Sequence, residues 1–176
     1  KHMTTQVYLD GAVPYPAEFA EIYRKKGYWI GQNLSDFLRE SAQKYPKNIA
    51  IYEGEKAVNY SEFDYLVDCC ASHLYQHGLR AGDKAVVQMP NHYQFYVLFF
   101  ALIRLGALPV MSLPAHRYAE LSSFFKQTQA KAYFCADFGA QKFDYRELAE
   151  KLQQTASCLR HVFILGNAGI ILPAAC

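Results

Sequence analysis

The chain has 176 residues, of which 52% are hydrophobic, and its formal net charge at neutral pH is +2. A chain of this length and apolar content can bury one sizeable core, which excludes a largely disordered segment. The small charge, with no basic run longer than residues 24–26, argues against a nucleic-acid-binding surface.

Five cysteines without a CxxC pair predict free thiols in a reducing compartment, so we expect a cytoplasmic protein. The longest apolar run, Phe95–Ile103, stops at Arg104. It falls short of the roughly 18–20 apolar residues that a membrane-spanning helix needs. We therefore expect this run to be a buried helix and the chain to have no membrane contact.

The sequence divides into three regions. Residues 1–14 begin with a sequence typical of a cloning remnant and continue as an extended arm that contains glycine and proline. Residues 15–166 carry the periodic apolar patterns of one folded unit. Residues 167–176, NAGIILPAAC, contain an apolar run with no element after it. We expect this tail to be a strand cut off from its continuation or a non-native ending.

The first half of the folded region predicts a helical arm, two further helices and a small hairpin. Apolar residues recur at helical spacing in three stretches, and two short strands flank a Gly-Glu turn. Ser35 and Ser61 are the expected N-caps of the second and third helices, and Gly27 and Gly78 are the expected stops of the first and third. The expected elements are helices over residues 17–26, 35–45 and 61–77 and strands over residues 49–52 and 56–59.

From Lys84 onward strands and helices alternate. Asn91 is the expected N-cap of a central helix and Gly106 its expected end. Alternation with connections this short implies right-handed crossovers, so the expected fold class is α/β with a doubly wound parallel sheet covered on both faces. The other expected elements are strands over residues 84–88, 108–111, 132–135 and 161–165 and helices over residues 119–129 and 145–153.

Cys69, His73 and His77 are residue types that can bind zinc, and they follow one another at intervals of four residues. The first and last of them are about 12 Å apart along a helix axis, so one ion cannot bind all three. No further ligand type lies next to the two histidines in a suitable pattern. We therefore predict an ordinary helix surface here and no metal site.

The loop PAHR, Pro114 to Arg117, directly follows the predicted strand 108–111. Open α/β sheets bind ligands at the carboxyl ends of their strands, so His116 and Arg117 are candidates to contact an anion or a carrier-protein surface. The alternative is that Arg117 only caps or salt-bridges a neighbouring element. The chain has no GxGxxG, no GxxxxGK[ST] and no GxSxG pattern, so no catalytic or cofactor-binding residue is predicted.

Several motifs occur in the order seen in one enzyme family. YPAEFAEIYRKKGYW at Tyr15–Trp29 and PAHR at Pro114–Arg117 resemble stand-alone aryl-acid adenylating enzymes, the 2,3-dihydroxybenzoate–AMP ligases of catechol siderophore assembly. Three further stretches resemble core motifs of the wider adenylate-forming, acyl-CoA synthetase-like family. They are VNYSEF at Val58–Phe63, GDKAVVQMP at Gly82–Pro90 and FFALIRLGALP at Phe99–Pro109.

The resemblance implies that residues 15–166 are the N-terminal subdomain of an adenylation domain, in a ligase of siderophore and nonribosomal peptide assembly. Such an enzyme uses ATP and Mg²⁺ to convert 2,3-dihydroxybenzoate to aryl-AMP, then loads the aryl group on the phosphopantetheine arm of an aryl carrier protein. Members are roughly three times as long as this chain. Their phosphate loop, aryl pocket and catalytic lysine lie downstream, so we expect the chain alone to bind no cofactor and to be inactive.

Two alternatives stay open: an aryl- or acyl-CoA ligase subdomain, and a non-catalytic interaction module built on the same scaffold. The aryl acid also stays open among 2,3-dihydroxybenzoate, salicylate and benzoate. Because a truncated subdomain exposes an apolar face, we further expect self-association through that face.

Overall fold

The computed structural model describes residues 12–137, 143–166 and 171–173. The chain forms two compact units, Lys1–Asn33 and Leu34–Cys176, and each is described by itself. The boundaries expected from sequence, at residues 14 and 166, stay predictions.

The first unit contains the expected short helix, α1 (Ala17–Lys25), and Gly27 follows it with a φ of 71°. Positive φ is the conformation in which glycine ends a helix at little steric cost. An aromatic cluster packs beside α1, because the Trp29 ring lies 5.3 Å from the rings of both Tyr15 and Tyr23. Among the described residues of this unit only Ala20 is buried, so the aromatic contacts are its main side-chain packing.

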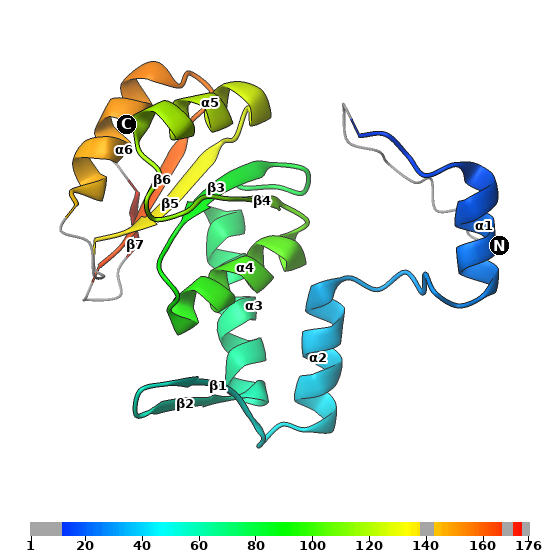
Figure 1. Ribbon diagram of the computed structural model, residues 1–176. Helices are drawn as coiled ribbons and strands as arrows, with labels where there is room; N and C mark the ends of the chain where they lie inside the picture. Colours follow the sequence, from blue (N-terminus) through cyan, green and yellow to red (C-terminus); the bar gives the residue numbers. More distant parts are fainter. Residues whose placement is uncertain (1–11, 138–142, 167–170, 174–176) are drawn as a thin grey trace. The chain divides into compact units, whose positions relative to one another are not determined.

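The second unit is an α/β fold with a small hairpin, as the sequence predicts (Figure 1). Its helices are α2 (Leu34–Lys44), α3 (Tyr60–Gln76), α4 (Tyr93–Leu105), α5 (Tyr118–Thr128) and α6 (Tyr145–Thr155). Its strands are β1 (Ile49–Glu53), β2 (Lys56–Asn59), β3 (Lys84–Gln88), β4 (Leu108–Met111), β5 (Ala132–Ala136), β6 (His161–Leu165) and β7 (Ile171–Pro173).

The main sheet has the strand order β4-β3-β5-β6-β7. The first four strands are parallel, and β3 pairs with β4 from Lys84 opposite Leu108 and with β5 from Ala85 opposite Ala132. The last strand, β7, pairs antiparallel with β6 and was not expected as a paired strand from the sequence. The rest of the tail, residues 167–170 and 174–176, lies outside the described residues.

Helices cover both faces of this sheet, which explains why its strands are continuously apolar. Ala85 and Val87 of β3 pack in one core with α3 and α4, whereas Val86 packs in a second core with α5 and α6. Successive side chains of a strand point to opposite faces, so the short run KAVVQ supplies both cores. None of the described helices is long and apolar enough to cross a membrane.

The edge strand β4 contains Pro109. The N–H of Leu108 donates to Asp83 O (2.8 Å) and that of Ser112 to Val87 O (2.9 Å), so even-numbered positions of this strand face β3. Pro109 therefore stands where an N–H would point away from the sheet. Proline is tolerated in a strand only at such edge positions.

Arg104, near the end of α4, ties three helices together. Its guanidinium donates to Asp64 Oδ1 (2.6 Å) and Asp68 Oδ1 (2.8 Å) of α3, and its Nε donates to Ser35 Oγ (2.7 Å) of α2. Arg39 of α2 contacts the same two aspartates from the solvent side. Because the Arg104 side chain is only 14% exposed, water replaces these contacts poorly if one partner is lost.

The hairpin β1–β2 is tied to the start of α4. One carboxylate oxygen of Glu53 pairs with His92 Nε2 (2.7 Å), and the other accepts the backbone N–H of Tyr93. The Lys56 ammonium lies 3.6 Å from the centre of the Tyr93 ring. A carboxylate that accepts an N–H from the first turn of a helix also interacts favourably with the helix dipole.

Three predicted N-caps are wrong by one or two residues. The cap of α3 is Asn59, whose Oδ1 accepts the N–H of Glu62 at 2.8 Å, rather than Ser61. The cap of α4 is His92 rather than Asn91. Ser35 lies inside the first turn of α2, where it is buried against Arg104. In each region more than one capping residue type was available, so the sequence alone did not decide among them.

Replacing Arg104 with Met keeps the aliphatic stem but removes the guanidinium that bonds to Asp64, Asp68 and Ser35, so that Asp64 keeps only the longer contact with Arg39 (3.7 Å). We expect the free energy of unfolding to fall by about 2–4 kcal/mol, because a largely buried set of charged hydrogen bonds is lost. Urea unfolding followed by circular dichroism measures this change. The matched control is Arg39→Met, at a half-exposed position, for which a loss below about 1 kcal/mol is expected. Equal losses in both variants would contradict the assigned role of Arg104.

Stability should fall in mild acid. Burial and the neighbouring His77 lower the pKa of both His73 and His161; for His161, Asp83 opposes this and Arg160 and Lys131 add to it. A histidine with a lowered folded-state pKa binds its proton more readily in the unfolded chain. Its contribution to the free energy of unfolding is therefore present above about pH 6.5 and is lost as the pH falls below that value. As the pH is lowered below about 6.5, the urea midpoint should drop less in a variant that carries both His73→Gln and His161→Gln than in the parent chain. An unchanged pH dependence would show that other groups cause it.

Candidate functional site at the carboxyl edge of the sheet

The parallel strands end along one edge of the sheet, and the chain leaves this edge toward opposite faces. After β3 it enters α4, which packs with α3, whereas after β5 it enters α6, which packs with α5 on the other face (Figure 1). The neighbouring strands β3 and β5 therefore flank a topological switch point. In open α/β sheets this is the place where ligands bind.

Gln88, the last residue of β3, fixes the loop that carries the PAHR motif. Its side chain is 1% exposed, and its Nε2 donates to Leu113 O (2.8 Å) and His116 O (2.9 Å). The hydroxyl of Tyr133 on β5 donates to Gln88 Oε1. Burial raises the pKa of Tyr133 well above its usual range, so the phenol stays protonated and remains a donor. The loop is therefore held from below by a buried polar network.

His116 lies half-buried in this loop, with its ring 5.4 Å from that of Phe124. Its Nδ1 accepts the backbone N–H of Leu113 (3.2 Å) and lies 3.1 Å from Ser112 Oγ. Because a backbone N–H can only donate, Nδ1 carries no proton in this arrangement and the ring proton is on Nε2. His116 thus contributes to the turn of the loop through one nitrogen.

Arg117 also serves the loop and the helix after it. Its Nη1 donates to Pro114 O (2.7 Å) and His116 O (2.8 Å), and its Cζ lies 3.9 Å from the centre of the Phe143 ring. Its backbone N–H donates to Glu120 Oε2 (2.8 Å) at the start of α5. These contacts match the alternative weighed from sequence, in which Arg117 supports a neighbouring element. Contact of His116 or Arg117 with a ligand stays a prediction.

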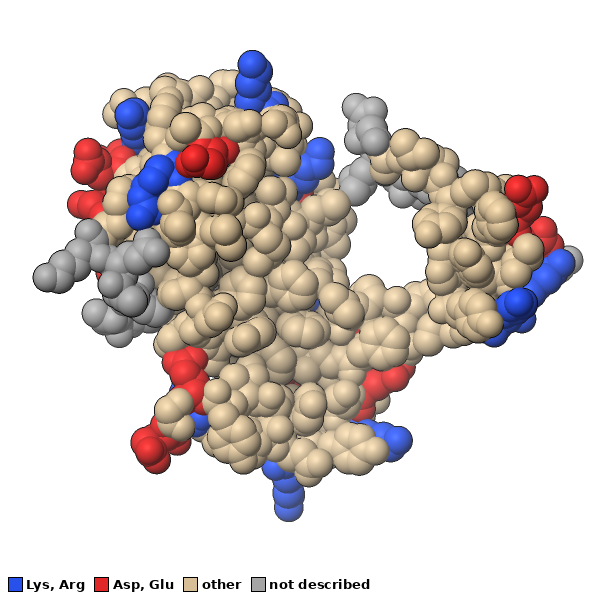
Figure 2. Space-filling view, in the orientation of Figure 1, with Lys and Arg blue, Asp and Glu red and all other residues tan. Residues whose placement is uncertain are grey.

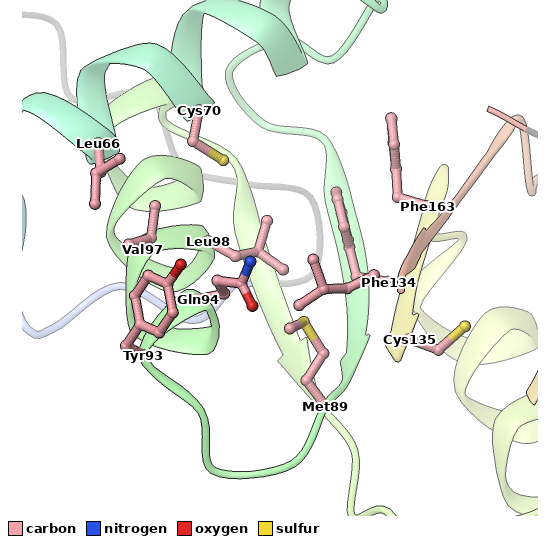
Figure 3. A pocket seen from close by; sticks show the side chains of 11 residues that line it. Leu66, Cys70, Met89, Tyr93, Gln94, Val97, Leu98, Phe134, Cys135 and Phe163 are labelled. Atoms are coloured by element: carbon pink, nitrogen blue, oxygen red, sulfur yellow. The ribbon is translucent and has the colours of Figure 1, made fainter. Parts of the chain in front are cut away.

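A cavity of about 220 Å³ opens next to the switch point, between α3, α4 and the strand ends (Figure 3). Cys70, Gln94, Leu98 and Phe134 converge on it, whereas the thiol of Cys135 points toward the other side of the sheet. The residues that line the cavity are Leu66, Cys70, Met89, Tyr93, Gln94, Val97, Leu98, Phe134, Cys135, Phe163 and Leu165.

The lining of this cavity offers no acid–base or nucleophilic chemistry at neutral pH. None of its side chains is a carboxylate, a histidine or a basic group. Burial, reinforced by Cys69, raises the pKa of Cys70 to about 12, and burial raises that of Cys135 to about 12. Both thiols therefore stay protonated, and only the thiolate is a good nucleophile. A triphosphate would find no basic partner here, so the cavity does not fit ATP.

Cys69, His73 and His77 are the residues for which no metal site was predicted. The rings of His73 and His77 lie 4.3 Å apart, as expected for neighbours one helical turn apart. Among the described residues no three histidine, cysteine, aspartate or glutamate side chains come close enough together to hold a metal ion. No described residue is therefore assigned to a metal ion.

Residues 38–168 match the family model described as AMP-binding enzyme. The chain belongs to this family. It is 41% identical over 165 residues to the 2,3-dihydroxybenzoate-AMP ligase of Bacillus subtilis, a match that covers 94% of this chain and 30% of that protein. It is 40% identical to the salicyl-AMP ligase / salicyl-S-ArCP synthetase of Mycobacterium tuberculosis, over 92% of this chain and 29% of that protein. The chain thus spans about a third of the length of these curated relatives.

Solved structures agree with the fold. The apo structure of Mycobacterium smegmatis MbtA superposes with a TM-score of 0.83 at 40% identity, over 92% of this chain and 30% of that one. The anthranilate CoA ligase AuaEII superposes with a TM-score of 0.68 at 15% identity, over 76% of this chain and 25% of that one, which shows the shared fold alone. The predicted fold class, an adenylate-forming α/β subdomain, is confirmed.

The residue that sequence reasoning missed is Gln88. One signal was available: KAVVQ ends a buried apolar strand with an amide side chain, and buried amides are nearly always hydrogen-bonded. Its partners could not be read from the sequence, because they lie 25 and 28 residues away in an irregular loop.

Replacing Gln88 with Leu keeps the volume of the side chain but leaves the buried Tyr133 hydroxyl without its acceptor and removes one of the two donors that each of the carbonyls of Leu113 and His116 has. We expect the free energy of unfolding to fall by about 1–3 kcal/mol, mainly because a buried hydroxyl is left unsatisfied. Amide hydrogen exchange of Leu113 and of residues 115–117 should become faster, because the loop loses its support. Gln127→Leu, on the exposed face of α5, is the matched control and should change neither quantity appreciably. Unchanged exchange in Gln88→Leu would contradict the role assigned to this residue.

Proposed function

We propose that this chain is the N-terminal part of an ATP-dependent aryl-acid adenylating ligase of siderophore assembly. The observation that supports the proposal is the identity of about 40%, over more than nine-tenths of the chain, to AMP ligases of 2,3-dihydroxybenzoate and salicylate from two organisms. A third relative, the vibriobactin-specific 2,3-dihydroxybenzoate-AMP ligase of Vibrio cholerae, is 37% identical. We propose 2,3-dihydroxybenzoate as the substrate, with salicylate as the next choice.

In the intact protein the aryl carboxylate would attack the α-phosphorus of ATP. The bond to the leaving pyrophosphate breaks as the acyl–phosphate bond forms, giving aryl-AMP. The phosphopantetheine thiol of an aryl carrier protein would then displace AMP. Mg²⁺, when bound, would neutralise phosphate charge. Acceleration of such a reaction comes from positioning and charge stabilisation, and the described residues contain no cluster suited to either.

The role proposed for the chain itself is therefore scaffolding. The buried hydrogen bonds of Gln88 and Tyr133 fix the PAHR loop to the ends of β3 and β5. The hydroxyl of Tyr145 in α6 also donates to Pro114 O (2.8 Å). A loop held from two elements presents a fixed backbone at the switch point. Catalytic groups on a longer polypeptide would be positioned against this rigid edge.

The second candidate is an aryl-CoA ligase. It is favoured by one relative, the 2-hydroxy-7-methoxy-5-methyl-1-naphthoate–CoA ligase of Streptomyces carzinostaticus, which is 34% identical over 89% of this chain. The two candidates share adenylation and differ in the thiol that accepts the acyl group. A non-catalytic interaction module, the third alternative, would show no exchange activity in any length of the polypeptide.

ATP–pyrophosphate exchange tests the proposal. We expect the 176-residue chain to show no exchange with any aryl acid, because it spans only about a third of the length of its AMP-ligase relatives. A polypeptide extended through the coding sequence beyond Cys176 should exchange with 2,3-dihydroxybenzoate faster than with salicylate and benzoate. Fastest exchange with benzoate or a long-chain acid would overturn the substrate proposal. Transfer to CoA rather than to a carrier protein would favour the second candidate.

A further inference from the structure

The amino ends of the parallel strands carry a row of cations. Lys84 begins β3, and Lys131 and Arg160 directly precede β5 and β6. The backbone N–H of Lys131 donates to Lys84 O (2.9 Å), and that of Arg160 donates to Lys131 O (2.8 Å). The three residues therefore lie side by side across three neighbouring strands, which in a sheet are about 4.8 Å apart.

Arg80 adds a further cation to this edge. Its backbone N–H donates to Asp83 Oδ2 (2.9 Å) in the turn that leads into β3. Its guanidinium carbon lies 3.8 Å from the centre of the Tyr75 ring, and its Nη1 donates to Tyr75 O (2.6 Å). A guanidinium held against an aromatic ring loses little further freedom when it binds an anion. We call Arg80, Lys84, Lys131 and Arg160 the amino-edge cluster.

Asp83, the carboxylate beside the amino-edge cluster, is already bonded. It is 9% exposed, its Oδ1 lies 2.6 Å from Lys131 Nζ, and its Oδ2 accepts the N–H of Arg80. Among the described residues no ion pair involves Lys84 or Arg160. Lys84 is half-buried and the other members of the cluster are exposed, so the edge presents positive charge to solvent.

His161, the first residue of β6, lies within the field of this charge. Burial and the neighbouring His77 lower its pKa, Arg160 and Lys131 lower it further, and Asp83 opposes them. Two members of the cluster therefore lie near enough to act on one imidazole, in agreement with their places on adjacent strands.

The spacing of the cluster favours an anion with several charges along its length. A row across three strands spans about 10 Å, which is more than one phosphate or carboxylate contacts. Nucleic acid is disfavoured, because the cluster is small beside sites that contact about 6–10 phosphates. Figure 2 shows acidic and basic side chains together around an uncharged middle, so a long polyanion would also meet carboxylates on that face.

We propose that the amino-edge cluster binds a short acidic segment of another protein, rich in aspartate and glutamate. In an extended segment the side chains that share a face recur about every 7 Å, a distance that flexible lysine and arginine side chains match. Exposed ion pairs are individually weak, so this binding is reversible and weakens with added salt. The cluster lies at the end of the sheet opposite the candidate site, and the inference does not rest on the proposed ligase activity.

Fluorescence anisotropy with a labelled oligoglutamate peptide tests this binding on the complete 176-residue chain. The test variant carries both Lys84→Gln and Arg160→Gln, which remove two charges of the cluster and leave the ion pair of Lys131 with Asp83 in place. At an ionic strength of about 0.02 M its dissociation constant should be about tenfold higher than that of the parent chain. Added salt should weaken binding by the parent chain more than binding by the variant.

The matched control carries both Lys44→Gln and Lys47→Gln. These substitutions remove the same charge at the end of α2 and directly after it, apart from the main sheet (Figure 1). The control should bind the peptide like the parent chain, within about twofold, because isolated surface charges away from the contact contribute little. Circular dichroism and urea midpoints establish that each variant is folded before its affinity is compared.

Three results would overturn the inference. The first is a parent chain that does not bind the peptide at low ionic strength. The second is an equal loss of affinity in the control, which would show that overall charge rather than the cluster holds the peptide. The third is tighter binding of a DNA duplex of the same total charge, which would assign the cluster to nucleic acid. The ATP–pyrophosphate exchange assay tests the proposed function separately.

Discussion

Burial of β3 on both faces is the constraint on which the other elements depend. A strand that is buried on both faces cannot hydrogen-bond to water. Its backbone N–H and C=O groups must therefore be satisfied by neighbouring strands on both edges, which here are β4 and β5. Its alternating side chains must be covered twice, which requires α3 and α4 on one face and α5 and α6 on the other. The only polar side chain that the strand carries into the interior, Gln88, finds its partners at the strand end, where the chain is irregular.

Because the sheet is buried on both faces, the residues that build it cannot also carry reactive groups. The residues that build the sheet are apolar, and at the carboxyl edge the polar groups mainly satisfy one another. His116 and Arg117 illustrate this point, since their contacts hold the turn after β4 and the start of α5. A site assembled on such an edge needs reactive groups from other segments. Membership of the family is therefore consistent with a carboxyl edge that has no reactive groups of its own, because the described residues form a scaffold for groups on other segments.

The fold could be predicted from the sequence because strand and helix periodicities alternate without interruption from Lys84 to Leu165. Glycine positions were equally informative, since Gly27, Gly78 and Gly106 all adopt positive φ where a helix stops. The errors occurred where several residues of similar chemistry compete, as with Asn59 and Ser61 or Asn91 and His92. The Gln88 network could not be predicted, because it depends on which distant side chains meet, and local pattern carries no information about that.

Pro109 has a consequence for how the sheet can grow. With its N–H replaced by a ring, the outward side of β4 offers the backbone donor of Met111 and none at position 109. A foreign strand approaching this side would meet one donor where a regular ladder needs two, and the pyrrolidine ring would keep it at a distance. The outward side of β4 is thus a poor template for a further strand, which disfavours edge-to-edge pairing of sheets on that side.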